Sequence, residues 1–255
     1  MEPSQELANR GSAKGGLART DAGDEALSPA DSGRRHLMRQ LTWGLLSAAT
    51  MALAAWAACA LHPDAAAGVK RTGQYRPGFP AFALELALPL AILQATLLPR
   101  WLPGLLPSGD ASRRTAFRVS WLACTTAGLA LALVPLWGID LDIMRRRHIG
   151  SVLLMVPGLA LMGWSQSLVL DRFGRTPPTW TRETVLAGAV GCSVGMMAAA
   201  LLGLSDPDGV TLSRFGGEVV SGPFEVVVAA CIGLGIGLAQ GRHGGEARPV
   251  IRAGS

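Results

Sequence analysis

The chain has 255 residues, of which 49% are hydrophobic and 16% are charged. Soluble domains carry roughly 25% charged residues, so this composition disfavours an ordinary soluble protein. The positive charge is almost entirely arginine, which stands between apolar runs, and the net charge is +5. This pattern favours anionic lipid headgroups as the partner of the arginines and disfavours nucleic acid.

Residues 1–36 are polar and mixed in charge, and they predict a disordered tail that buries too little apolar surface to fold alone. No apolar run follows the N-terminus promptly, so the segment is not a secretory signal peptide. We predict three parts: a cytoplasmic tail of residues 1–36, a transmembrane domain of residues 37–240, and a short cytoplasmic tail of residues 241–255.

Six apolar runs follow the N-terminal tail, each about 20 residues long, which is the length that crosses a bilayer as a helix. Within lipid the backbone must satisfy its own polar groups, so runs of this length form helices. The sequence therefore predicts an all-α, polytopic integral membrane protein with six transmembrane helices. The runs span 40–62, 80–99, 117–138, 149–170, 184–204 and 219–239.

A carboxylate interrupts the second run at Glu85, four residues before Pro89. Because proline has no N–H, Pro89 leaves the Glu85 carbonyl without its helical donor. A second carboxylate, Glu225, opens the sixth run. If both termini lie on one side, these two helices run in the same direction and both carboxylates lie roughly 8–9 Å below the outer boundary.

Two interpretations of Glu85 and Glu225 stay open. A glutamate near a helix end extends its carboxylate toward water or pairs with an arginine of an outer loop, with no further role. Alternatively, the two carboxylates flank one outward-facing site, where they bind a cation or proton or act as an acid and base pair. No other residue is a candidate for catalysis.

Prolines inside and after the runs predict kinks and ends. Pro89, Pro135 and Pro157 lie within runs and predict helix kinks. Pro99 and the prolines after it predict the end of the second helix. Tryptophans near run ends predict positions at the membrane interface. These tryptophans are Trp101, Trp137, Trp164 and Trp180.

Small residues recur every four positions along the fifth run and form a stripe on one helix face. Such a stripe lets two helix backbones approach closely. It serves packing within the chain or the contact face of a homodimer, and the sequence does not separate the two. The stripe consists of Ala187, Gly191, Gly195, Ala199 and Gly203.

Other polar residues inside the runs are expected to form hydrogen bonds between helices. They are Gln94, Thr125, Thr126, Ser165, Gln166, Ser167 and Ser193. The four cysteines each lie alone in a different run, without metal-ligand spacing, and are expected to pack as small apolar residues. We predict neither a metal site nor a cofactor.

The chain carries no phosphate-binding glycine loop and no serine-hydrolase motif, which favours a non-enzymatic function. Kinked helices and small-residue stripes favour a transport or permease-type component for a small molecule, with a second copy or an ATPase subunit as partner besides the lipid bilayer. The alternatives are a small intramembrane enzyme with cyclase-like acid/base chemistry on a lipid-like substrate, or a non-catalytic accessory membrane subunit.

Arginine and lysine are more frequent at the run ends that share the side of the N-terminus, so both termini are predicted to be cytoplasmic. The run Arg145-Arg146-Arg147 falls on the opposite side and departs from this rule. Richness in alanine, glycine and arginine suggests a bacterial protein, and hence the cytoplasmic membrane as its location.

Overall fold

The structure is a computed structural model that describes residues 29–61, 79–101, 111–138, 148–202, 204 and 223–243. The described residues form six helices and no strand, which confirms the predicted fold class. Each helix is long and apolar enough to cross a membrane. The helices are α1 (Pro29–Leu61), α3 (Phe79–Trp101), α4 (Ala111–Gly138), α6 (His148–Phe173), α7 (Trp180–Leu201) and α8 (Pro223–Arg242).

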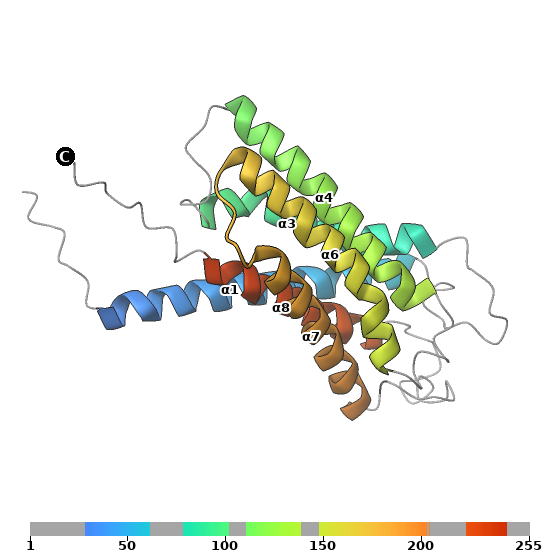
Figure 1. Cartoon of the computed structure of the whole chain (residues 1–255). Coiled ribbons are helices and arrows are strands. Elements are labelled where there is room, and N and C mark those ends of the chain that lie inside the picture. The colour runs from blue at the N-terminus through green and yellow to red at the C-terminus, as the bar shows by residue number, and fades with distance from the viewer. Residues whose placement is uncertain are drawn as a thin grey trace, which may run out of the picture.

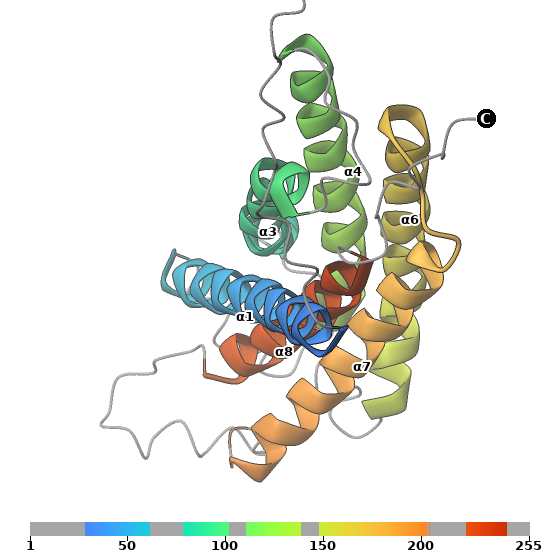
Figure 2. The ribbon, with the colours of Figure 1, turned by 90° about the vertical axis from the view of Figure 1, so that its left-hand side faces the viewer.

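The six described helices form a closed ring of packing contacts. Figure 1 shows α3, α4 and α6 on one side of α1 and α8. Each helix packs against the helices that precede and follow it, and the ring closes where α1 packs against α8. Figure 2 shows α1 and α8 together, with α3 above α1 and α7 below α8. The described connection between α6 and α7 is short and tied by the Thr176 hydroxyl, which donates to the Ser167 carbonyl over 2.8 Å.

Several helices extend beyond the apolar runs that predicted them. α1 begins at Pro29, inside the segment assigned to the tail, and α4 begins at Ala111, ahead of the run that starts at residue 117. α3 continues two residues past Pro99 and ends at Trp101, ahead of Pro103, so it ends within the group of prolines that predicted its end. A helix satisfies its own backbone hydrogen bonds in both lipid and water, so it can continue past the membrane boundary. Hydropathy therefore predicts where the membrane ends but not the residue at which the helix ends.

The prolines expected to kink helices lie inside them. α3 contains Pro89, α6 contains Pro157, and Pro135 falls in the last turn of α4. Each leaves the carbonyl four residues earlier without its helical donor, namely Glu85 and Leu153 for the two central prolines. Kinking at these positions stays a prediction.

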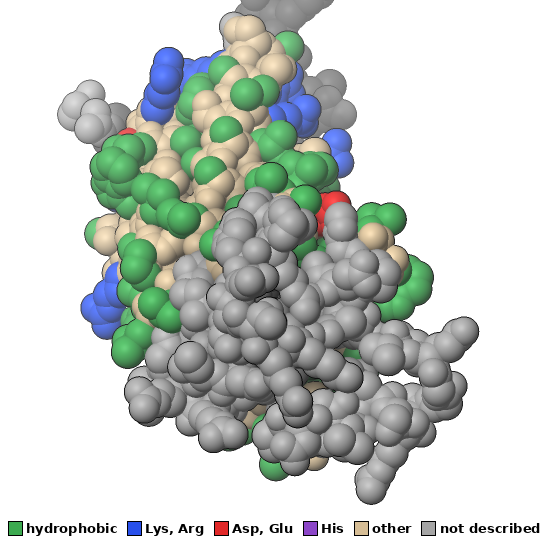
Figure 3. All heavy atoms as spheres, turned by 90° about the vertical axis from the view of Figure 1, so that its right-hand side faces the viewer, with side chains coloured by type: hydrophobic (Ala, Val, Ile, Leu, Met, Phe, Trp, Pro, Cys, Tyr) green, Lys and Arg blue, Asp and Glu red, His purple; other side chains and the backbone are tan. Residues whose placement is uncertain are grey.

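The faces of α7 show that lipid is the surrounding medium. Its small residues face the ring, where Gly191 and Gly195 are buried, while Leu186, Val190 and Met197 are more than half exposed. In water this arrangement leaves large apolar side chains unprotected. In a bilayer it is favourable, because lipid covers large side chains and small ones permit close helix contact. Figure 3 shows hydrophobic side chains spread along the sides of one face of the molecule.

α7 packs on α8 through its small-residue stripe. A Cβ atom added at Gly195 would lie 2.8 Å from Val228 Cα, and one added at Gly191 would lie 2.9 Å from Ile232 Cα. Ala187 and Ala199 lie in the same helix, and Gly203 lies outside the described residues. The described members of the stripe that contact α8 therefore pack within the chain.

α8 packs on α1 by the same means. A Cβ atom at Gly233 would lie 2.6 Å from the Ser47 carbonyl oxygen, and one at Gly237 would lie 2.7 Å from Ser47 Oγ. Both distances are too short for any side chain beyond hydrogen. α8 thus contacts α1 on one side and α7 on the other with its backbone.

The arginines of the described residues all lie at one end of the ring, where α1, α4 and α7 begin and where α3, α6 and α8 end. We call this the basic end. It carries Arg34, Arg35, Arg39, Arg100, Arg113, Arg114, Arg118, Arg172, Arg175, Arg182 and Arg242.

A leucine at position 195 tests the α7–α8 contact. Gly195→Leu places a side chain where only 2.8 Å separates the added Cβ from the α8 backbone, so we expect a loss of about 3 kcal/mol or more and little folded protein. Ala200→Leu adds the same side chain on the exposed face of α7 and should be tolerated. Size-exclusion chromatography in detergent checks both. A folded, monodisperse Gly195→Leu protein would contradict this packing.

Candidate functional site

The two predicted carboxylates lie at the end of the ring opposite the basic end. Glu85 is half-buried in the second turn of α3, and Glu225 is buried in the first turn of α8. Glu225 lies within electrostatic range of Cys59 near the end of α1. Residues adjacent to both carboxylates, Phe82 on α3 and Val228 on α8, belong to one apolar cluster. A site shared by the two carboxylates stays a prediction.

The more developed polar arrangement lies toward the basic end, where three buried side chains form a chain of hydrogen bonds. Trp121 Nε1 of α4 donates to Gln94 Oε1 of α3 over 3.2 Å, and Gln94 Nε2 donates to Gln240 Oε1 of α8 over 2.8 Å. All three side chains are at most 1% exposed. We call Trp121, Gln94 and Gln240 the first amide chain. It crosses the interior of the ring from α4 to α8.

A second chain of buried hydrogen bonds links α7, α6 and α4. Trp180 Nε1 of α7 donates to Gln166 Oε1 of α6 over 3.2 Å, and Gln166 Nε2 donates to Thr125 Oγ1 of α4 over 2.8 Å. These side chains are also at most 1% exposed. We call Trp180, Gln166 and Thr125 the second amide chain. Each chain begins at an indole N–H, which can only donate, so the amide oxygen must face the indole.

The two chains meet at their tryptophans. The rings of Trp121 and Trp180 are 5.8 Å apart and nearly perpendicular, which is a favourable edge-to-face arrangement. Phe117 packs between Trp121 and Phe173, at 5.4 Å and 5.9 Å from their ring centroids. The interior of the ring is therefore filled by aromatic rings at this level. Trp180 is buried here, so the expectation that it sits at the lipid interface is wrong, whereas Trp164 is exposed.

An ionisable cluster covers the second amide chain at the basic end. His243 Nε2 lies 2.9 Å from Glu183 Oε2, and the His243 ring lies 5.5 Å from the Trp180 ring. Arg242 Nη1 lies 3.6 Å from Glu183 Oε1, but the Arg242 side chain is mostly exposed, so this ion pair contributes little. The buried His243 contact ties the end of α8 to the first turn of α7.

The expected hydrogen bonds between helices are confirmed for Gln94, Gln166 and Thr125. They are wrong for Ser167 and Ser193, which donate to carbonyls of their own helices. Ser165 also donates to the Leu161 carbonyl of its own helix, but its hydroxyl makes a side-chain hydrogen bond with Cys124 of α4 as well. A serine hydroxyl reaches the carbonyl three or four residues earlier, whereas a glutamine amide extends past its own helix. Thr126 Oγ1 has no hydrogen-bond partner among the described residues.

Gln240 and His243 were not among the sequence candidates, because they stand at the end of the last run. A sequence signal for the amide chains nevertheless exists. Gln94 opens the octet QATLLPRW and Gln166 opens QSLVLDRF, with glutamine, leucine and arginine at matching places and an aromatic residue last. Both octets end α3 or α6 at the basic end, so both glutamines lie at matching depth.

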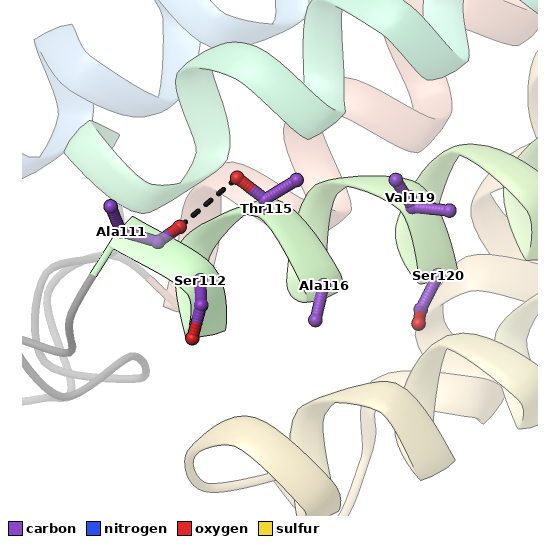
Figure 4. A pocket seen from close by; sticks show the side chains of 6 residues that line it. All are labelled: Ala111, Ser112, Thr115, Ala116, Val119 and Ser120. Carbon is purple, nitrogen blue, oxygen red and sulfur yellow. Dashed lines mark hydrogen bonds between the residues drawn. The ribbon is translucent and has the colours of Figure 1, made fainter.

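A shallow groove lies on α4 at the basic end (Figure 4). Ser112, Ala116 and Ser120 point to one side of it, and Thr115 Oγ1 donates to the Ala111 carbonyl over 3.0 Å. One exposed helix face lines the groove, so it is separate from the buried amide chains.

The described cysteines are free thiols, with Cys59 and Cys192 buried. Within the described ranges, no three histidine, cysteine or acidic side chains gather as metal ligands. Comparison of the chain with protein-family models, curated proteins and solved structures gives no match. The arrangement of its own side chains is therefore the basis for any functional conclusion.

Gln166→Leu tests the second amide chain. The substitution leaves the buried Trp180 N–H without its acceptor, so we expect a loss of about 1–3 kcal/mol, seen as a lower midpoint of thermal unfolding in detergent. The matched control is Ser193→Ala, which removes an exposed hydrogen bond within α7. Equal unfolding midpoints for both variants would contradict a stabilising role of this chain.

Proposed function

We propose that the protein is a transport or permease-type component for a small molecule in a bacterial cytoplasmic membrane. The observation that carries the proposal is the first amide chain, which places buried polar groups across the interior of a six-helix ring. Polar groups inside a membrane bundle typically face a substrate path or a partner helix. Here they sit on helices from opposite sides of the ring, with two carboxylates toward its other end.

We infer that both termini are cytoplasmic, because arginine and lysine are more frequent along the sequence at the run ends on the side of the basic end, and positive charge favours the cytoplasmic side. The basic residues assigned to the opposite side, including Arg145, Arg146 and Arg147, lie outside the described residues. In this orientation Glu85 and Glu225 lie toward the outside and the aromatic layer around Trp121 and Trp180 closes the inner half. Such a protein is closed inward and opens by separating helices around the amide chains. A second copy or an ATPase subunit is the partner that this function class uses.

Two other functions are alternatives. The buried Glu225, within electrostatic range of Cys59, suits acid/base chemistry on a lipid-like substrate, as in a small intramembrane enzyme. The dense backbone contacts of α8 suit an accessory subunit without a substrate. The transport proposal explains more, because it gives a role to the polar groups at both ends of the ring.

Uptake by inverted membrane vesicles tests transport even though the solute is unidentified. Vesicles that contain the protein or its Gln94→Leu variant are incubated with a complete metabolite extract, with and without ATP, and their contents are measured by mass spectrometry. We expect at least one solute to accumulate about tenfold more with the unaltered protein. Identical contents in all vesicles would contradict the proposal.

Glu225→Gln tests the outer carboxylates in the same assay. If Glu225 helps to admit the solute, the neutral variant should reduce its accumulation about tenfold and leave the amount of folded protein unchanged. The control is Asp171→Asn, which removes an exposed carboxylate at the basic end. Full uptake by both variants would show that Glu225 has no role in uptake and only extends its carboxylate toward water.

A further inference from the structure

The first amide chain ends in a donor that has no acceptor. Trp121 can only donate, so it fixes the Gln94 oxygen toward itself and the Gln94 amide N–H toward Gln240. This in turn fixes the Gln240 oxygen toward Gln94. Gln240 Nε2, at the far end, is buried and has no hydrogen-bond partner among the described residues. Rotating the Gln240 amide does not help, because it would bring two N–H groups together.

Two more unpaired groups lie on α1, the helix that packs against this part of α8. Trp43 Nε1 and Ser47 Oγ of α1 are buried and have no partner in the described part of the chain. The packing of α1 on α8 sets their level: a Cβ at Gly237 would touch Ser47, and one at Gly241 would touch Gln40. Gln240 lies between these two glycines on α8, as Trp43 lies between Gln40 and Ser47 on α1.

The second amide chain shows that an unpaired buried donor is not a general feature of these side chains. It begins with the same indole-to-amide bond, but Gln166 Nε2 ends on a threonine hydroxyl that accepts it. None of its side chains has an unpaired buried polar atom among the described residues. A buried polar group without a partner is destabilising by about 1–3 kcal/mol and is exceptional in native proteins.

The helix that covers this place, α3, makes the weakest contact between neighbours in the ring. α3 packs less extensively on α1 than any other ring neighbours pack on each other, and it barely contacts α8. It is also the only one of the six described helices without a glycine, so no backbone contact of the α1–α8 kind holds it. Its links near the unpaired donors are the Gln94–Gln240 bond and the pairing of Trp101 with Trp43, whose rings are 5.5 Å apart.

We propose that the Trp43, Ser47 and Gln240 side chains form a binding site for an oxygen acceptor of the transported solute, a carbonyl or carboxylate group, reached when α3 separates from α1 and α8. These side chains, on the facing surfaces of α1 and α8, supply two N–H donor groups and a hydroxyl. Indole and amide N–H groups only donate, so they favour a hydrogen-bond acceptor over a cation. The inference rests on the proposed transport function and adds the class of group that is recognised.

Fluorine NMR of the full-length protein in detergent tests the site. All seven tryptophans are replaced by 5-fluorotryptophan, and the Trp43 and Trp180 resonances are assigned by Trp43→Phe and Trp180→Phe. The probes are sodium acetate and N-methylacetamide, with tetramethylammonium chloride as the cationic control. We expect the Trp43 resonance to shift saturably with acetate or N-methylacetamide, and Trp180, whose N–H is already paired, to remain in place.

Substitutions separate a direct contact from a general effect. Gln240→Met should weaken the Trp43 response at least fivefold, whereas Gln166→Met, the same change in the second amide chain, should leave it intact. Ser47→Ala is a smaller change and serves if Gln240→Met does not fold. Equal responses of Trp43 and Trp180, or no response of Trp43 to either probe, would overturn the site.

Two outcomes separate this inference from the proposed function. If Trp43 responds only to exchange of H₂O for D₂O, water is the occupant and the solute site is refuted, while vesicle uptake leaves transport standing. If acetate binds and no vesicle uptake occurs, the binding site holds and transport is refuted.

Discussion

Backbone contact through glycine holds α8 between α1 and α7, and the remaining structure depends on it. Lipid removes the advantage of burying apolar side chains between helices, so close approach must supply the attraction. Gly233 and Gly237 give that approach to α1, and Gly191 and Gly195 give it to α8 from α7. Because α1 and α8 are the first and last of the described helices, their contact closes the ring.

Closure by α8 determines where the polar groups lie. It carries Glu225 to the end of α1 and Gln240 into the ring, where the amide reaches α3. It also brings His243 onto Trp180 and Glu183. The most tightly packed helix therefore presents polar groups at both ends, and α3, which barely contacts α8, is joined to it by the Gln94–Gln240 bond. The weakest contact of the ring, between α1 and α3, is the place that suits opening of the ring.

The number and type of the helices could be predicted from the sequence, because a long apolar run has few alternatives to a spanning helix. The ends of the helices were less predictable: α1 begins at Pro29 and α3 passes Pro99. Residues beyond an apolar run can still be helical, so the run does not mark where the helix ends. Gln94 and Gln166 were expected to bond to other helices, but their partners depend on register across the ring, which a single run does not encode.

The missed residues share a cause. Gln240 and His243 lie where the last run meets polar sequence, so nothing in their neighbourhood marks them as buried. These positions are buried because α8 packs between α1 and α7. Trp180 is a similar case. Its position near a run end predicted the membrane interface, but packing against Trp121 across the ring buries it.

The contact between α1 and α8 can be measured directly by cysteine cross-linking in native membranes. In a chain with the four native cysteines replaced by alanine, Gln40→Cys and Gly241→Cys are combined, since a Cβ at position 241 lies 3.4 Å from Gln40 Cγ, close to disulfide geometry. The closed ring predicts an intramolecular disulfide on oxidation, seen as a faster monomer band without reductant. An unchanged monomer, or a cross-linked dimer, would contradict it.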